Sequence, residues 1–256
     1  MQEKDFFSIL NPGILSDEYM DSKHVDFLAS RFREQRYVAL PGLFKNNVMN
    51  TIEREVRKLD KYKEYKKFYM PGYQTPRNLS VIGGRKIMTF STLLPLLYAK
   101  SDIHKLLASI TGSTVYPIAH VDEYIVINRL EGPGHTHGWH LDDPKYALII
   151  VLEGADGDSG GCLEYISQWP ELCRRNGVDP ENATELLLNQ LGERKVVRQK
   201  LKGGDCYLLD AADCLHRVTP LEQEGSTRVA LNMAYHDSLN VDYGLTAQTL
   251  YGEGSF

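Results

Sequence analysis

Residues Glu131–Asp143, EGPGHTHGWHLDD, place three histidines and two aspartates between two expected strands. Within this stretch, one residue separates His140 from Asp142. Because residues i and i+2 of an extended segment point to the same side, an imidazole and a carboxylate at this spacing can reach one metal ion. The stretch therefore predicts half of a metal site, and a third ligand must come from elsewhere in the chain.

The composition is that of a globular protein with a small-molecule partner. The chain has 256 residues, of which 42% are hydrophobic and 25% are charged, and no linker-like segment divides it, so we expect one domain over residues 1–256. A net charge of −5 gives no electrostatic reason to expect a nucleic-acid partner. The four cysteines form no CxxC pair, which predicts reduced and mostly buried thiols.

The sequence also gives no reason to expect a membrane partner. Its first ten residues, MQEKDFFSIL, carry charges where a signal peptide has an apolar core, and no window approaches the roughly 18 apolar residues of a membrane span. A cytoplasmic location is the expectation that follows.

The front of the chain, about residues 1–112, is expected to be mainly helical. Apolar spacings of three and four predict helices that begin near Ser16, Asn46 or Asn47, Ser91 and Ser101. A short strand is expected at YVAL, residues 37–40. The basic run at residues 57–67 is interpreted as a solvated helix face, and Met70–Lys86, rich in proline and glycine, as an irregular loop.

After Gly112 the pattern changes to short β-rich runs separated by turn residues, interrupted by one expected helix between Asp179 and Gly192. We expect an α+β fold in which the helical front packs on a double-stranded β-helix, or jelly roll, over about residues 113–237. Residues 238–256 form a C-terminal tail. The open mouth of such a barrel commonly holds a metal ion and a small ligand.

Two residues later in the chain, His216 and Arg228, complete the set of candidate site residues. His216 begins a strand after a strand and a turn, which in a β-barrel folds back beside His140, and Arg228 opens the final strand. Two imidazoles and a carboxylate on one face of a metal leave the other face open, as non-haem Fe(II) requires for a cosubstrate and dioxygen. An arginine near that face can bind a dianionic acid through a bidentate ion pair.

This set resembles the Fe(II)/2-oxoglutarate-dependent dioxygenases, and the resemblance covers about Val121–Asp237. It implies that His140, Asp142 and His216 bind Fe(II). It also implies that Arg228 pairs with the distal carboxylate of 2-oxoglutarate and that O2 is the second cosubstrate.

A narrower resemblance is to the iron/2-oxoglutarate enzymes that halogenate free lysine and related amino acids, and to their hydroxylase relatives. In that family the amino-acid pocket is lined by an arginine on an early loop, a glutamate on the strand before the His-rich turn, a histidine three residues before the first ligand, an acid after the metal triplet and an asparagine on the final strand. The matching residues are Arg77, Glu123, His137, Asp143 and Asn232. By this resemblance, the arginine and histidine bind the α-carboxylate and the two acids bind ammonium groups.

One position separates the two branches of that family. Its halogenases have glycine where this chain has Asp142, which leaves a coordination site for chloride. The resemblance therefore implies hydroxylation of an unactivated C–H bond of a free basic amino acid, with L-lysine as the favoured substrate and C4 as the favoured position. Ornithine, or another small amino acid or metabolite, is the alternative, and the exposed helical front leaves room for a homodimer.

A second alternative is a cupin-type metalloenzyme. The PGHTH segment also resembles the first cupin motif, in which case His135, His137 and His216 bind the metal and Asp142 is a turn residue. The segment DAADCLH lacks the glycine that precedes the late histidine in the second cupin motif, which favours the set with Asp142. A barrel that has lost its metal is disfavoured for a related reason, because all three ligands and the arginine are present.

Overall fold

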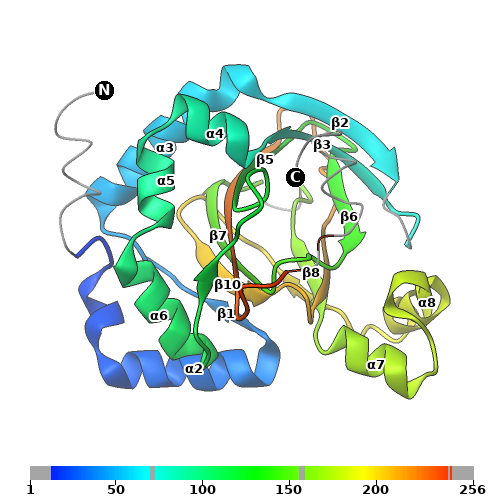
Figure 1. The fold of residues 1–256 in the computed structure, drawn as a ribbon. Helices are drawn as coiled ribbons and strands as arrows, with labels where there is room; N and C mark the ends of the chain where they lie inside the picture. Colours follow the sequence, from blue (N-terminus) through cyan, green and yellow to red (C-terminus); the bar gives the residue numbers. More distant parts are fainter. Residues whose placement is uncertain (1–12, 70–72, 156–158, 242, 244–256) are drawn as a thin grey trace.

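The computed structural model describes residues 13–69, 73–155, 159–241 and 243 as a curled antiparallel sheet with helices packed against its outer side (Figure 1). The α+β, jelly-roll architecture expected from the sequence is confirmed. In the described part of the chain, no helix has the length and apolar character needed to cross a membrane.

The helices are α2 (Ser22–Gln35), α3 (Asn46–Leu59), α4 (Gly84–Phe90), α5 (Leu93–Tyr98), α6 (Ser101–Thr111), α7 (Trp169–Arg175) and α8 (Thr184–Gly192). The strands are β1 (Tyr37–Ala39), β2 (Glu64–Tyr69), β3 (Pro76–Ile82), β4 (Tyr116–Pro117), β5 (Ile125–Glu131), β6 (Thr136–His140), β7 (Tyr146–Glu153), β8 (Leu163–Ile166), β9 (Val197–Gln199), β10 (Cys206–Asp210), β11 (Leu215–Val218) and β12 (Thr227–His236). Short 3-10 turns occupy Asp17–Met20, Asp60–Tyr62 and Pro180–Asn182.

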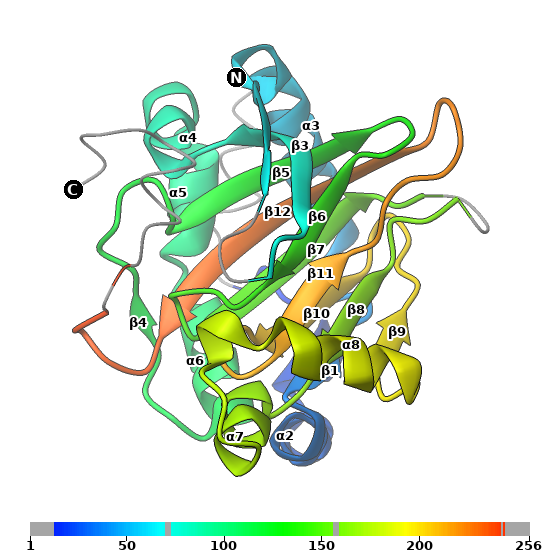
Figure 2. The ribbon, with the colours of Figure 1, turned by 90° about the vertical axis from the view of Figure 1, so that its right-hand side faces the viewer.

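The sheet has two walls joined by β3. Its strand order is β1-β10-β7-β12-β5-β3-β6-β11-β8-β9, with β2 paired to β3 and β4 paired to β12. Figure 2 shows β5, β3, β6 and β11 running side by side across the turn from one wall to the other. This curl brings the end of β6, the start of β11 and the inner face of β12 to one interior space.

The larger wall is apolar on both faces, which explains its nearly continuous hydrophobic strands. Side chains alternate along β7, so Leu148 and Ile150 pack against the helices, whereas Ala147, Ile149 and Val151 face the barrel interior. The outer core also contains the buried faces of α2, α3, α5 and α6. The helical front therefore fixes the curvature of the wall that carries β12.

A smaller apolar cluster supports the other wall from outside. Trp139 on β6 and Leu215 on β11 pack with Trp169 and Leu187 from α7 and α8. The indole nitrogen of Trp169 donates a hydrogen bond to the Tyr73 hydroxyl at 2.7 Å. Because this cluster anchors β6 and β11, it holds the two strands on which the histidines of the expected metal site lie.

Several expected elements are confirmed. The helices α3 and α6 bury the apolar faces predicted for them, and α6 ends at Gly112 with a positive φ of 70°. Ser91 caps α5 by accepting the Leu94 N–H. Ser16 precedes a 3-10 turn, and the cap of α2 is instead Asp21, whose carboxylate accepts the Lys23 N–H at 3.1 Å. The four cysteines are buried and unpaired, as expected.

Two predictions for the front half are wrong. The basic run at residues 57–67 is not one helix face, because α3 ends at Leu59 and the chain then enters β2. The segment Met70–Lys86 is not an irregular loop throughout, although residues 70–72 lie outside the described part of the chain. Pro76–Ile82 form β3, which pairs with β5 and β6, and Leu79 and Val81 are buried there. Pairing with two strands outweighs the local proline and glycine content.

Candidate metal centre

His140, Asp142 and His216 are brought together by the pairing of β6 with β11. His140 is the last residue of β6 and lies directly opposite His216 in the antiparallel register. Asp142 follows β6, and its backbone N–H donates to the carbonyl oxygen of Ala211 at 3.0 Å, which ties this turn to the end of β10. Three ligands from two separate stretches of sequence thus converge on one point.

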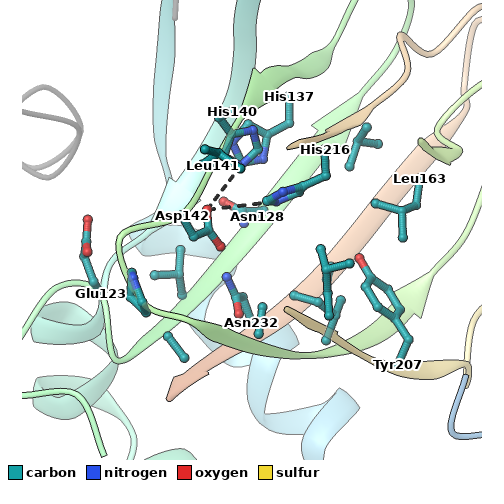
Figure 3. Close-up of a pocket in the computed structure, with 18 of the residues that line it drawn as sticks. Glu123, Asn128, His137, His140, Leu141, Asp142, Leu163, Tyr207, His216 and Asn232 are labelled. Atoms are coloured by element: carbon teal, nitrogen blue, oxygen red, sulfur yellow. Dashed lines mark ion pairs between the residues drawn. The ribbon is translucent and has the colours of Figure 1, made fainter. Parts of the chain in front are cut away.

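The distances fit a shared metal ion. The Asp142 Oδ1 atom lies 3.3 Å from His140 Nε2 and 4.0 Å from His216 Nε2 (Figure 3). One ligand atom from each of the three residues lies within 4.8 Å of the other two. Both histidines are buried, and the Asp142 side chain is 21% exposed.

Backbone contacts fix both imidazoles in the form that a metal requires. The Nδ1 atom of His140 lies 2.7 Å from the Gly138 carbonyl oxygen, and that of His216 lies 2.9 Å from the Cys214 carbonyl oxygen. A carbonyl oxygen can only accept, so Nδ1 carries the proton in each ring and Nε2 keeps its lone pair for a metal.

The charge states of Asp142 and His216 also fit a metal site. Burial alone would raise the pKa of Asp142, but the hydrogen bond with His140 and the nearby His216 lower it to about 2. Burial, followed by the neighbouring His140, lowers the pKa of His216 to about 4. The centre therefore presents a carboxylate and a neutral imidazole at neutral pH, the deprotonated forms that bind metal ions.

One cavity contains all of the site residues expected from the sequence. Its empty space is about 950 Å³, a volume that includes open solvent at its mouth. Its lining includes the three metal-binding candidates together with Arg77, Glu123, His137, Asp143, Arg228 and Asn232. Two polar residues that the sequence did not indicate, Asn128 on β5 and Tyr207 on β10, also line it (Figure 3).

Arg228 is a buried cation that lines this cavity. Its residue is 2% exposed, and in the described part of the chain its Nε and Nη2 atoms have no hydrogen-bond partner. Burial raises the pKa of the Tyr207 phenol, and the nearby Arg228 guanidinium opposes that rise. Because a buried guanidinium is costly without an anion, this pair fits a carboxylate ligand such as that of 2-oxoglutarate. The sequence gives no local sign that Tyr207 belongs to a site, because only the pairing of β10 beside β7 turns its side chain inward.

Arg77 and His137 form a second polar pair. They are register partners on β3 and β6, and an Arg77 Nη2 donates to His137 Nε2. Arg77 lies on a buried strand and not on the loop expected from the sequence. Burial and the adjacent Arg77 hold the pKa of His137 well below its usual range. The neutral His137 ring stacks on His140 with centroids 3.9 Å apart, so it also packs against a metal-binding candidate.

Two acids also line this cavity. Glu123 is in the turn before β5, not on the strand itself, and Asp143 follows Asp142. Burial, followed by the charges of Asp143 and Asp142, raises the pKa of Glu123 to about 8. Asn232 projects from β12, and its Oδ1 has no hydrogen-bond partner among the described residues. Carboxyl and amide oxygen atoms are therefore gathered in this part of the cavity lining.

His135 has a structural contact away from this centre. Its Nδ1 accepts the Glu131 backbone N–H at 3.1 Å, and its ring lies 5.7 Å from the Tyr65 ring. Among the described residues, the group close enough to share a metal consists of His140, Asp142 and His216. The geometry thus favours this triad over the cupin-type set.

Comparison with known proteins assigns the chain to a family. The sequence model of the Halogenase D family matches residues 20–252. The chain belongs to this family. No curated protein matches it by sequence.

Solved structures share the fold at low sequence identity. The non-haem α-ketoglutarate-dependent epimerase SnoN from nogalamycin biosynthesis has a TM-score of 0.63 and 17% identity, over 85% of this chain and 84% of its own. An oxidoreductase of the 2OG-Fe(II) oxygenase family from Burkholderia pseudomallei has a TM-score of 0.59 and 16% identity, over 84% and 92%. A prolyl hydroxylase from Trichoplax adhaerens has a TM-score of 0.56 and 12% identity, over 86% and 91%.

The family, the triad and the buried arginine agree. The donor set of this Halogenase D family member can hold Fe(II), and the similar solved structures include an α-ketoglutarate-dependent epimerase and a member of the 2OG-Fe(II) oxygenase family. The donor set fits iron, because two imidazoles and one carboxylate on one face are the usual ligands of non-haem Fe(II) oxygenases. The narrower relation to hydroxylases of free lysine is a matter of proposal.

Proposed function

We propose that this enzyme hydroxylates an unactivated C–H bond of a free basic amino acid, with L-lysine as the substrate and C4 as the preferred position. The observation that carries the choice of hydroxylation is the place of Asp142. Its carboxylate oxygen lies 3.3 Å from His140 Nε2 and 4.0 Å from His216 Nε2, where a third metal ligand belongs.

The triad leaves no position for a halide ion. His140, Asp142 and His216 would hold iron with three protein ligands, and its remaining positions would be needed by a 2-oxoacid and dioxygen. When bound, iron with these cosubstrates supplies an oxidant that removes hydrogen from a C–H bond. A carboxylate ligand at residue 142 therefore favours transfer of oxygen to the substrate over transfer of chloride.

Arg228 and Tyr207 are suited to hold 2-oxoglutarate. The guanidinium has unsatisfied donors at Nε and Nη2. The Tyr207 hydroxyl lines the same cavity and can donate its proton there. Both residues can therefore donate to the distal carboxylate, which orients the other end of the cosubstrate toward the triad.

The remaining polar groups match a free amino acid with a cationic side chain. Arg77 supplies a positive charge for the α-carboxylate, with the neutral His137 beside it. Asp143 supplies negative charge for an ammonium group, and the Asn232 Oδ1 atom is a further acceptor. Glu123, whose pKa burial raises to about 8, keeps its proton near neutral pH and becomes a charged partner when an ammonium group lies beside it. In Figure 3, Glu123 and Tyr207 lie on opposite sides of Asp142, so substrate and cosubstrate would approach the iron from different ends. A pocket with acids at this end suits a basic amino acid better than a neutral one.

An amino-acid panel tests this proposal. The Fe(II)-loaded protein is incubated with 2-oxoglutarate, O2 and single amino acids in chloride buffer, and succinate and products are measured by mass spectrometry. We expect succinate coupled to a lysine product heavier by one oxygen atom. Turnover of ornithine alone would replace the substrate and keep the chemistry, whereas a chlorinated product would contradict the assignment of hydroxylation to Asp142.

A further inference from the structure

Three buried tyrosines extend from the wall of the metal cavity through the barrel interior. Tyr207 on β10 lines the cavity, and its ring centroid lies 5.5 Å from that of Tyr37 on β1. Tyr37 in turn stacks on Tyr165 of β8, with centroids 5.2 Å apart and planes 24° from parallel. All three are at most 4% exposed. Neither Tyr37 nor Tyr165 has a part in binding either substrate.

Tyr207, Tyr37 and Tyr165 form a row of rings, and both ends of this row lie close to the metal centre. Tyr165 lies directly opposite His216 in the pairing of β8 with β11, and directly opposite residues share one face of a sheet. Tyr207 projects into the cavity (Figure 3), near enough to Asp142 for the two groups to interact electrostatically. Tyr37 bridges them. An electron therefore needs only short steps between rings in contact to pass from any of the three tyrosines to the iron site.

Packing alone does not explain three phenols at this place. The row lies in an apolar cluster of alanine, leucine, isoleucine and valine side chains, where phenylalanine would fill the same space without burying a hydroxyl. Tyr165 lies opposite Val197 of β9, and the exposed Arg31 of α2 is close enough to act on its phenol electrostatically. The row thus ends at a part of the barrel that borders exposed side chains. A phenol differs from a phenyl ring chiefly in that it can lose an electron and a proton.

We propose that Tyr207, Tyr37 and Tyr165 form an electron-donor chain that discharges the iron centre when dioxygen and 2-oxoglutarate have reacted but no substrate C–H bond is in place. The inference rests on the proposed function, because that oxygen-activating reaction supplies the oxidant. Its consequence is protection, since an oxidant held in a closed cavity without substrate otherwise attacks the side chains that line it.

The steps balance as single hydrogen-atom equivalents. Tyr207 gives one electron to the iron centre and its phenolic proton to the cavity that its side chain lines. Tyr207 then recovers one electron and one proton from Tyr37, and Tyr37 recovers the same from Tyr165. Two such transfers supply two electrons and two protons. These would convert the oxygen atom of O2 that does not enter succinate into water and return the centre to Fe(II). An external one-electron donor such as ascorbate restores each tyrosine with one electron and one proton.

The test uses the full chain loaded with Fe(II) and mixed with O2 and 2-oxoglutarate in the absence of any amino acid. Samples are frozen at short times for electron paramagnetic resonance, and aged samples are digested to locate oxygen added to the protein. For the wild type we expect a tyrosyl radical signal that narrows when the protein contains ring-deuterated tyrosine. For Tyr37→Phe and Tyr165→Phe we expect a weaker signal, added oxygen on cavity-lining peptides, and several-fold fewer turnovers before inactivation.

Tyr235→Phe is the matched control. Tyr235 is fully buried and stacks on Tyr98 at 4.8 Å, in a different aromatic group, so this variant removes a buried hydroxyl without touching the row. Equal radical yields and equal self-oxidation in the three variants would overturn the inference, as would succinate formation with no tyrosyl signal in the wild type. Those results leave the proposed function intact. Absence of succinate under every condition would overturn both. Thermal unfolding of each variant checks that it is folded. If one of Tyr37→Phe and Tyr165→Phe fails to fold, the other alone tests the inference.

Discussion

His216 lies directly opposite His140 across the pairing of β11 with β6, and their ring centroids are 4.2 Å apart. Each ring is oriented by its Nδ1 hydrogen bond to the carbonyl oxygen of the residue two positions earlier in its own segment. The two imidazoles are therefore arranged before any metal arrives. Such preorganisation by outer contacts raises metal affinity.

This arrangement predicts different results for two histidine variants. We expect His216→Ala to lose nearly all bound iron, because one of three ligands is removed from a site built for three. His135→Ala keeps its iron, because His135 accepts a backbone N–H of Glu131 and lies outside the triad. Iron per chain after desalting, measured by elemental analysis, decides between them. Loss of iron in the His135 variant alone would favour the cupin-type set.

The carboxylate at residue 142 gives a second prediction. We expect Asp142→Gly in chloride buffer to lose most lysine hydroxylation and to gain a chlorinated product, because the variant frees one coordination position for a halide. Since removal of a contact to a ligand already costs roughly 10–100-fold, loss of the ligand itself should cost no less. Mass spectrometry of the products with chloride and with bromide measures the change. Hydroxylation at the wild-type rate in this variant would mean that Asp142 does not bind iron.

The buried guanidinium gives a third prediction. We expect Arg228→Met to raise the Kd for 2-oxoglutarate by roughly 10–100-fold, because hydrogen bonds to charged groups contribute about 1.5–3 kcal/mol. Tyr207→Phe removes one neutral donor and should raise the Kd by about fivefold. Calorimetric titration of the Fe(II)-loaded protein with 2-oxoglutarate measures both. A larger effect from the tyrosine than from the arginine would reverse their assigned roles.

The clustering of His140, Asp142 and His216 could be predicted from the sequence, because it follows from residue types and their spacing. His140 and Asp142 sit at the end of one strand, and the late strand that carries His216 follows a turn and another strand. The helices α3 and α6 were predictable for a similar reason, since their apolar faces follow the helical period. In each case the signal is local.

The parts of the fold and of the site that the sequence did not predict depend on contacts between segments that are distant along the chain. β3 looked like a loop because proline and glycine surround it, and only its pairing with β5 and β6 makes it a buried strand. Tyr207 and Asn128 carry no local sign of a site, because the curl of the sheet determines which face of β10 and β5 points inward. The C-terminal tail expected at residues 238–256 lies mostly outside the described part of the chain, apart from residues 238–241 and Tyr243. The backbone N–H of His120 donates to the Tyr243 hydroxyl at 3.4 Å.

The acid at the far end of the cavity gives the last prediction, which concerns stability against pH. Burial, then Asp143 and Asp142, raise the pKa of Glu123 from its ordinary 4.5 to about 8. Between these values the folded protein keeps a proton that the unfolded chain has lost, so this group makes stability fall as the pH rises toward 8. We expect Glu123→Gln, which cannot ionise, to flatten that fall and to unfold at a higher Tm than the wild type at pH 9, by a shift on the order of a few degrees.

Glu64→Gln is the control with the opposite sign. The pKa of Glu64 is lowered, chiefly by its hydrogen bond with Lys86, so its ionised form is already complete well below neutral pH. Its removal should leave the slope of Tm against pH unchanged between pH 6 and pH 9. Scanning calorimetry of the three proteins over that range measures the slopes. If wild type and Glu123→Gln run parallel, the Glu123 carboxyl is ionised throughout, and acids at this end of the cavity then hold a full negative charge before substrate binds.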